Sequence, residues 1–191
     1  GDVSYTFDDD GNMTSKTEGS VTTTYSWDAG NHMVGVSTVD DMWSYSYDAF
    51  GTRVIWAENG DVTSFIVDPI GYGNLAAEYD DAGNMGAAYI HGYGLIRQDR
   101  GEAYYYTFDA IGSTSEIAND AAGVPVNSYA YDPFGVLVGS SESIGNRFQY
   151  VGEYGVMHET NGLEFMRARS YESGTGRFVS ADPLGIGAGD V

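Results

Sequence analysis

Two short acidic segments are the first residues in this sequence whose types and spacing could support chemistry. Asp8-Asp9-Asp10-Gly11-Asn12 and Asp80-Asp81-Ala82-Gly83-Asn84 each gather several oxygen-bearing side chains. Calcium prefers clustered oxygen ligands of this kind. The glycine comes too early for an EF-hand loop, however, and the same spacing recurs elsewhere in the chain as ordinary turns. We therefore favour solvated turns for both segments and keep a calcium loop as the alternative.

The other residue types that catalyse reactions or bind metals show no useful spacing. His32, His91 and His158 are far apart in the sequence, and their separation matches no metal-ligand pattern. The chain has no Gly-x-Ser-x-Gly motif and no cysteine, so a serine-hydrolase elbow, a thiol nucleophile and thiolate metal sites are unsupported. No helix is predicted after the Gly185–Gly189 run, which argues against a phosphate loop. We expect no metal and no cofactor.

An internal repeat sets the elements that must carry these side chains. Tyr5-Thr6-Phe7-Asp8 recurs as Tyr25-Ser26-Trp27-Asp28, as Tyr45-Ser46-Tyr47-Asp48 and, more loosely, as Phe65-Ile66-Val67-Asp68, so the four Asp residues lie 20 positions apart. The phase then slips. The pattern returns as Tyr106-Thr107-Phe108-Asp109 and Tyr129-Ala130-Tyr131-Asp132, with weaker copies at Tyr79-Asp80 and Tyr89-Ile90-His91-Gly92.

The turns within this repeat predict one β-hairpin per repeat. A turn with Gly or Asn follows each Asp, and these residues tolerate the backbone angles that tight turns need. A second turn falls in the middle of the repeat, at Glu18-Gly19, Asp40-Asp41, Asn59-Gly60 and Arg100-Gly101. Two turns per repeat leave strands of about seven residues.

Alternation within the strands predicts an all-β fold with one aromatic face. The two aromatics of each repeat lie at positions i and i+2, on the same side of a strand. We interpret the resulting stripes as core or inner-wall packing, with sugar stacking as the alternative. An open sheet rarely exceeds about ten strands without curling. The hairpin array that we assign to residues 1–145 is longer than this, so we expect it to curl into a spiral, shell or barrel segment.

Charge and composition exclude several classes of partner. Asp and Glu outnumber Lys and Arg by 28 to 8, which gives a net charge of -20. A polyanion of this strength repels nucleic acid phosphates and anionic lipid headgroups.

The sequence contains no predicted membrane helix, because no apolar run approaches the roughly 20 residues that such a helix needs. The chain begins Gly1-Asp2-Val3, without Met or a signal peptide, and we interpret it as an excised or processed piece of a longer protein.

The C-terminal region carries a more specific motif. Tyr150-Val151-Gly152 precedes Asn161-Gly162-Leu163-Glu164-Phe165-Met166-Arg167-Ala168-Arg169-Ser170-Tyr171, and Gly176-Arg177-Phe178-Val179-Ser180-Ala181-Asp182-Pro183-Leu184-Gly185 follows. Together with the tandem Tyr-Asp repeat, this run resembles the RHS/YD-repeat family at its RHS-repeat-associated core. We assign residues 146–191 to this core region, truncated at its C-terminal end.

The resemblance implies a hollow shell of YD repeats, as in bacterial Rhs proteins, the C components of Tc toxins and animal teneurins. In bacterial members the shell encloses a C-terminal toxin, and the core is an aspartic autoprotease that releases it. By motif position Asp182 matches the first catalytic Asp and Arg169 the catalytic Arg, with Arg167 as the weaker choice on the same strand face. The second Asp would lie beyond Val191, so the self-cleaving pair is incomplete and a structural interpretation of both residues stays open.

Three functions follow as expectations. The first is a structural shell segment that encloses or presents a C-terminal toxin or effector, its partner within the parent chain alongside neighbouring YD-repeat units. The second is an extracellular surface or fibre-forming adhesion module, which associates with further copies through open strand edges. The third is part of an aspartic autoprotease in the longer parent. We expect a secreted or cell-surface protein, bacterial rather than eukaryotic, with no nucleic acid partner and no membrane insertion.

Overall fold

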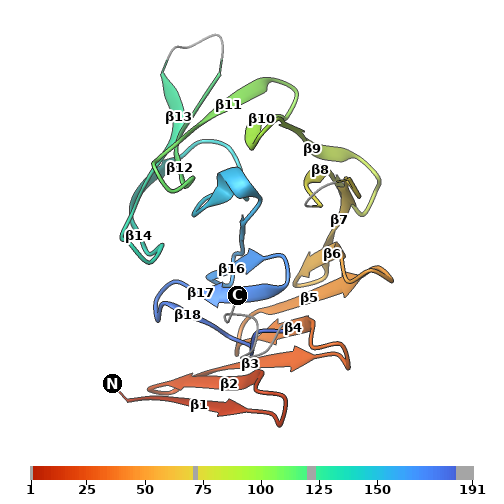
Figure 1. Ribbon diagram of the computed structural model, residues 1–191, viewed down its shortest axis with the longest axis vertical. Helices are drawn as coiled ribbons and strands as arrows, with labels where there is room; N and C mark the ends of the chain where they lie inside the picture. The colour runs from red at the N-terminus through yellow and green to blue at the C-terminus, as the bar shows by residue number, and fades with distance from the viewer. Residues whose placement is uncertain (1, 71–72, 120–123, 184–191) are drawn as a thin grey trace, which may run out of the picture.

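A computed structural model describes residues 2–70, 73–119 and 124–183 and contains one long antiparallel sheet (Figure 1). Fourteen strands follow one another in the sheet in sequence order. They are β1 (Val3–Phe7), β2 (Met13–Glu18), β3 (Val21–Trp27), β4 (Met33–Ser37), β5 (Met42–Tyr47), β6 (Arg53–Glu58), β7 (Asp61–Val67), β8 (Leu75–Asp80), β9 (Met85–His91), β10 (Leu95–Asp99), β11 (Ala103–Phe108), β12 (Thr114–Asn119), β13 (Pro125–Tyr131) and β14 (Leu137–Glu142). This confirms the all-β hairpin array, with strands slightly shorter than the predicted seven residues.

The Asp of each repeat closes the turn that follows an odd-numbered strand. In the turn between β5 and β6, Oδ1 of Asp48 accepts hydrogen bonds from the backbone N–H of Phe50 at 2.8 Å and of Thr52 at 2.9 Å. The same pair of bonds recurs at Asp28, Asp109 and Asp132. The repeated Asp is therefore explained by turn geometry.

The mid-repeat turns are tighter. Glu58 pairs with Asp61, which leaves Asn59 and Gly60 as a two-residue loop. Both loop residues have positive φ, 52° and 95°, and this is the conformation that Asn-Gly favours in hairpins.

A β-bulge at the end of each odd strand of the repeat accounts for the curl of the sheet. The register between β3 and β4 shifts between Ser26 and Trp27. Equivalent shifts occur in the β1–β2, β5–β6, β7–β8, β11–β12 and β13–β14 pairs. A bulge bends and twists a strand, and further register shifts occur in the β8–β9, β9–β10 and β12–β13 pairs. Irregularities repeated along the sheet favour its curl. Figure 1 shows the resulting arc, which does not close on itself.

One weaker copy of the repeat lies out of phase. Asp80 ends the even-numbered strand β8. Because neighbouring strands are antiparallel, its turn lies at the opposite ends of the strands from the turns at Asp48 and Asp109. The Tyr89–Gly92 segment, in contrast, ends β9 and keeps the phase of the odd strands. Tyr79-Asp80 therefore repeats the turn chemistry and not the hairpin unit.

A second, smaller sheet lies within the arc (Figure 1). We call residues 146–183 the plug. It contains the 3₁₀ helix η1 (Gly152–Tyr154) and the four antiparallel strands β15 (Met157–His158), β16 (Leu163–Met166), β17 (Arg169–Glu172) and β18 (Arg177–Phe178). No helix among the described residues is long and apolar enough to cross a membrane.

The hydrophobic core lies between the plug and the concave face of the sheet. From the sheet, the core includes the side chains of Tyr25, Met33, Trp43, Tyr45, Trp56, Phe65, Leu75 and Tyr89. From the plug, it includes those of Phe148, Met157, Leu163, Phe165 and Val179. Within a repeat, Tyr25 is buried whereas its neighbours Thr24 and Ser26 are exposed. The aromatic face thus lines the inner wall, where the plug covers it.

Candidate functional site

A buried ion pair anchors the plug to the sheet. Nη2 of Arg53, on β6, lies 2.7 Å from Oε1 of Glu159, and the two side chains are 2% and 3% exposed. The indole N–H of Trp56 donates to the other carboxylate oxygen at 2.7 Å. The guanidinium also lies 3.4 Å from the ring centroid of Phe165. These short contacts compensate both charges, as burial requires, while Nε of Arg53 is buried without a hydrogen-bond partner.

A second ion pair, with side chains 15% and 8% exposed, repeats this arrangement with the charges exchanged. Here the plug supplies the cation, Arg147, whose Nε lies 3.0 Å from Oε2 of Glu78 on β8. Tyr89 donates its hydroxyl proton to the same carboxylate. Burial acts to lower the pKa of Arg147, but Glu78 and Glu159 together outweigh it and raise that pKa, so the guanidinium stays charged. The guanidinium carbon of Arg147 lies 4.5 Å from the ring centroid of Trp56.

Neutral and partly exposed contacts extend the interface along the sheet. Asn161 of the plug donates to the hydroxyl of Tyr45 at 2.7 Å. Trp43 donates to Thr160 at 2.8 Å, and Lys16 donates to Glu172 at 2.7 Å. These contacts involve β2 and β5, so the plug is fixed at several points.

The turns that follow the odd-numbered strands line one end of the strands, which we call the rim of the sheet. Glycines in these turns allow the plug to approach the rim. Gly112 and Gly135 have φ of 85° and 93°. A Cβ at Gly112 would lie 2.5 Å from the ring of Tyr154, and one at Gly135 would lie 2.6 Å from the ring of Tyr150. Turn conformation and close packing therefore both require glycine at these two positions.

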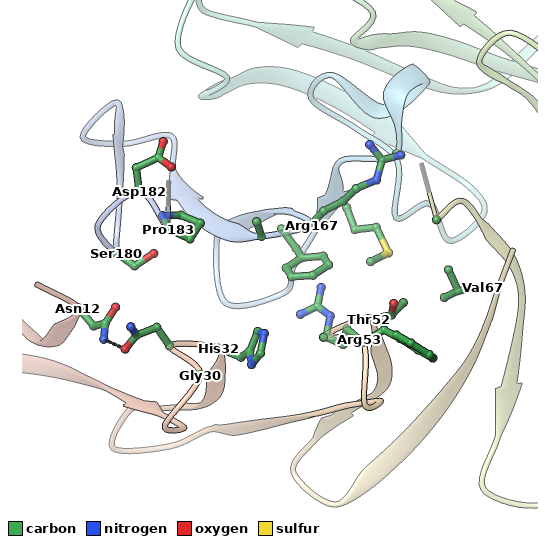
Figure 2. A pocket seen from close by; sticks show the side chains of 18 of the residues that line it. Asn12, Gly30, His32, Thr52, Arg53, Val67, Arg167, Ser180, Asp182 and Pro183 are labelled. Atoms are coloured by element: carbon green, nitrogen blue, oxygen red, sulfur yellow. Dashed lines mark hydrogen bonds between the residues drawn. The ribbon is translucent and has the colours of Figure 1, made fainter. Parts of the chain in front are cut away.

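A cavity of about 550 Å³ remains between the plug and the rim of the sheet (Figure 2). Its walls come from the turns near Asn12, His32 and Thr52 on one side and from the plug on the other. Ser180, Ala181, Asp182 and Pro183, the last described residues, line it as well. The chain therefore reaches the cavity at Pro183, on the concave side of the sheet.

Asp182 and Arg169 form an ion pair. Nη1 of Arg169 is 3.1 Å from Oδ2 of Asp182. The guanidinium carbon lies 3.7 Å from the ring centroid of Phe178. The side chains are 24% and 44% exposed, so the pair lies in a partly solvated place. Asp10, from the first turn, is another acid that lines the cavity.

Arg167 does not share a strand face with Arg169, and that expectation was wrong. Arg167 lies in the turn between β16 and β17, with φ of 58°. It lines the cavity and donates to Oδ1 of Asn74 at 3.2 Å. The Met-Arg-Ala-Arg sequence contains no Gly, Asn or Pro to indicate a turn, which is why the sequence pattern suggested a continuous strand.

The acidic segments lie in turns. Oδ1 of Asp8 accepts the backbone N–H of Asn12 at 2.8 Å, and Oδ2 accepts its side-chain amide at 3.0 Å. These bonds lower the pKa of Asp8, and the same two bonds form between Asp80 and Asn84. Among the described residues no three His, Cys, Asp or Glu side chains group closely enough to hold a metal ion.

The three histidines have separate local partners. Nδ1 of His32 lies 3.0 Å from Asp28, Nε2 of His91 lies 2.9 Å from the carbonyl oxygen of Leu75, and Nδ1 of His158 lies 2.8 Å from Glu164. Each has a structural interaction of its own. The Gly185–Gly189 run lies outside the described residues.

Sequence reasoning missed the residues that join plug and sheet. Arg53 and Arg147 are two of only eight basic residues in the chain. Arg53 also begins a strand of mostly apolar residues, Arg53-Val54-Ile55-Trp56-Ala57. A rare cation beside a buried aromatic was the available signal, but nothing in the sequence identified Glu159 as its partner.

Comparison with known proteins identifies relatives for nearly the whole chain. A family model described as the teneurin YD-shell matches residues 1–186. The tRNA3(Ser)-specific nuclease WapA of Bacillus spizizenii is 32% identical over 95% of this chain, and the tRNA nuclease WapA of Bacillus subtilis strain 168 is 34% identical over 95%. The chain spans 8% of the length of each of these two relatives.

Solved structures share the fold. The TcdB2-TccC3 crystal structure matches 98% of this chain with a TM-score of 0.67 at 14% identity, and the Photorhabdus luminescens Tc holotoxin pore matches 99% with a TM-score of 0.65 at 14% identity. This chain covers 12% of each of those chains. The hairpin repeat, the curled sheet and the match over residues 1–186 agree, and the chain belongs to the teneurin YD-shell family.

Proposed function

We propose that this chain is a wall segment of a longer YD-shell protein, and that the shell encloses or presents a C-terminal effector. The observation that carries the proposal is the position of the plug, which is fixed inside the arc by Arg53–Glu159 and Arg147–Glu78. The plug brings Pro183 to a cavity on the concave side. A segment that continues from this point would begin inside the curl of the sheet.

The charge of the chain limits where a nuclease activity could reside. Two relatives are named as tRNA nucleases, and an effector that acts on RNA fits the proposal. A net charge of -20 repels RNA phosphates. We therefore place any such activity outside this chain and assign the chain a structural role. We further propose that the protein is secreted or lies at the cell surface of a bacterium.

The test is protection of the effector from protease in the longer natural protein. We expect limited proteolysis to leave the region after Val191 intact while the shell is folded. Glu159→Gln, which leaves Arg53 buried without a counter-charge, should loosen the plug and speed cleavage of that region. Glu18→Gln, at an exposed carboxylate, is the matched control and should leave protection unchanged. Equal digestion of the region within the intact protein and as an isolated fragment would contradict enclosure.

A second candidate function is self-cleavage in the longer protein. The observation in its favour is the Arg169–Asp182 ion pair at the cavity where the chain reaches Pro183. Acid–base cleavage by carboxylates needs two of them, one protonated and one ionised. We propose Asp182 as one member and expect the other beyond Val191.

A further inference from the structure

A smaller cavity lies on the other side of the plug, between the plug sheet and the last hairpin. Its volume is about 200 Å³, and Tyr131 of β13, Gln149, His158, Glu164 and Ser173 contribute to its lining. Glu164 pairs with His158 on β15 and with Tyr171 on β17. By strand alternation its side chain leaves β16 on the opposite face from those of Leu163 and Phe165.

Three oxygen atoms of these lining residues are buried without a hydrogen-bond partner. They are Oε2 of Glu164, the hydroxyl oxygen of Tyr131 and Oγ of Ser173. The Glu164 side chain is only 4% exposed. A buried polar atom without a partner is costly and is rare in folded proteins. All three oxygens can accept a hydrogen bond, and the ionised Glu164 carboxylate can only accept, so the site suits a group that donates several.

The other buried carboxylates at the plug interface show which kind of group satisfies them. Glu159 binds the guanidinium of Arg53, and Glu78 binds that of Arg147. In both cases the guanidinium also lies over an aromatic ring. Among the described residues that line the smaller cavity there is no Lys or Arg, and His158 reaches only Oε1 of Glu164.

The surroundings of the smaller cavity are negative. Glu142 on β14, Asp109 and Asp132 in the rim turns, and Glu159 in the plug act electrostatically on His158 or on the tyrosines near it. His158 is the one side chain among the described residues of the lining that can carry a positive charge. A donor-rich cation would therefore find both the unpartnered oxygens and a favourable field.

We propose that this cavity binds a primary ammonium or guanidinium group, held by Glu164, Tyr131 and Ser173. The group has two conceivable sources, a free small cation and a Lys or Arg side chain of a protein segment, and both offer several N–H donors. The ring of Tyr131 adds a surface of the kind over which Arg53 and Arg147 lie. The proposal does not depend on the function of the shell.

Saturation-transfer NMR with methylguanidinium chloride tests the site, with NaCl used to keep the ionic strength constant. We expect saturable binding to the chain. Glu164→Gln should weaken it by about tenfold or more, because a hydrogen bond to a charged group is lost. Tyr131→Phe removes only the hydroxyl and should also weaken it, and this variant serves if Glu164→Gln does not fold. Glu116→Gln, at an exposed carboxylate on β12, should bind like the wild type.

A second probe distinguishes the two sources. Tighter binding of acetyl-Gly-Arg-Gly-amide than of methylguanidinium supports a protein side chain as the ligand, whereas binding of methylguanidinium alone supports a free cation. Three results would overturn the proposal. They are no saturable signal from either probe, affinity unchanged by both Glu164→Gln and Tyr131→Phe, and displacement of the probe by millimolar calcium at constant ionic strength.

Discussion

Arg53 and Glu159 are separated by 106 residues in the sequence, yet their side chains meet at 2.7 Å in the interior of the molecule. Arg53 belongs to the sheet and Glu159 to the plug, so this contact joins the two parts of the fold. A charge pair with 2% and 3% exposure is sensitive to the loss of one partner, because the other is then left uncompensated.

Removing the charge of Glu159 alone should therefore destabilise the chain strongly. We expect Glu159→Gln to lower the free energy of unfolding in urea by about 3–5 kcal/mol. The double variant Arg53→Met with Glu159→Leu removes both charges of this pair and should recover most of that loss. Glu18→Gln, at the 65% exposed end of the Lys16–Glu18 pair, should cost less than about 1 kcal/mol. A double variant as unstable as Glu159→Gln would contradict this account.

The two faces of the sheet should respond differently to truncation. Tyr25 and Tyr45 are 7% and 5% exposed and belong to the core under the plug. Tyr25→Ala and Tyr45→Ala should each cost about 2–4 kcal/mol, as other large-to-small core changes do. Thr24→Ala affects an exposed hydroxyl bonded to Ser37 and should cost far less. Equal losses of unfolding free energy in all three variants would show that the faces are not distinguished.

The hairpin array could be predicted because its determinants are local. The Tyr-x-aromatic-Asp unit places two aromatics on one face, and Asp48 shows how the last residue caps the next turn through bonds to Phe50 and Thr52. These contacts span only two to four residues. The position of the turn at Asp80 could not be predicted in this way, because turn chemistry alone does not reveal at which end of the strands a turn lies.

The plug could not be predicted in the same way. Its contacts with the sheet, such as Asn161 with Tyr45 and Lys16 with Glu172, join residues more than a hundred positions apart. They depend on how far the sheet curls, which is the sum of small bends at successive bulges. Arg169 and Asp182 were singled out only through the family motif. The turn at Arg167 was missed because a non-glycine residue occupies a positive φ there.

The His158–Glu164 pair should make stability depend on pH. Burial acts to lower the pKa of His158, but the hydrogen bond and charge of Glu164 outweigh it and raise that pKa above 6.5. A raised folded-state pKa contributes stability that is fully present below the unfolded value and is lost as pH rises through the folded value. Burial likewise raises the pKa of Glu164, so its contribution also falls with rising pH, beginning above 4.5.

The measurement is urea unfolding of the wild type and of His158→Gln over a pH series. Because the wild type loses the contribution of His158 at high pH, the difference between the two proteins should be largest near about pH 6 and should shrink toward about pH 9. His91→Gln is a suitable comparison, because burial lowers the pKa of His91 and the sign of its pH dependence is reversed. A difference that is constant over the series would argue against a titrating pair.

Salt should stabilise the chain. A net charge of -20 produces self-repulsion in the folded state, and added salt screens it. We expect the melting temperature to rise between low salt and about 0.5 M NaCl, because the Debye length falls below about 5 Å over that range.

Millimolar calcium should raise the melting temperature no further than its ionic strength does, since the Asp8 and Asp80 carboxylates already accept hydrogen bonds within their own turns. A large extra rise with calcium would favour the calcium-loop alternative.

Asp182 should be chemically silent in this chain and active in a longer one. Incubation of the chain across about pH 4–8 should give no self-cleavage by mass spectrometry, because one carboxylate cannot supply both an acid and a base. A protein extended beyond Val191 to include the second Asp should cleave itself and lose this activity with Asp182→Asn. Arg169→Ala should impair cleavage, because Arg169 is the charge partner of Asp182 at 3.1 Å. Arg167→Ala should be milder, because Arg167 lies in the turn before β17 and donates a hydrogen bond to Asn74.

Normal cleavage with Asp182→Asn would assign Asp182 to the turn alone. Self-cleavage of the short chain would instead indicate another acid, and Asp190 would be the first to replace.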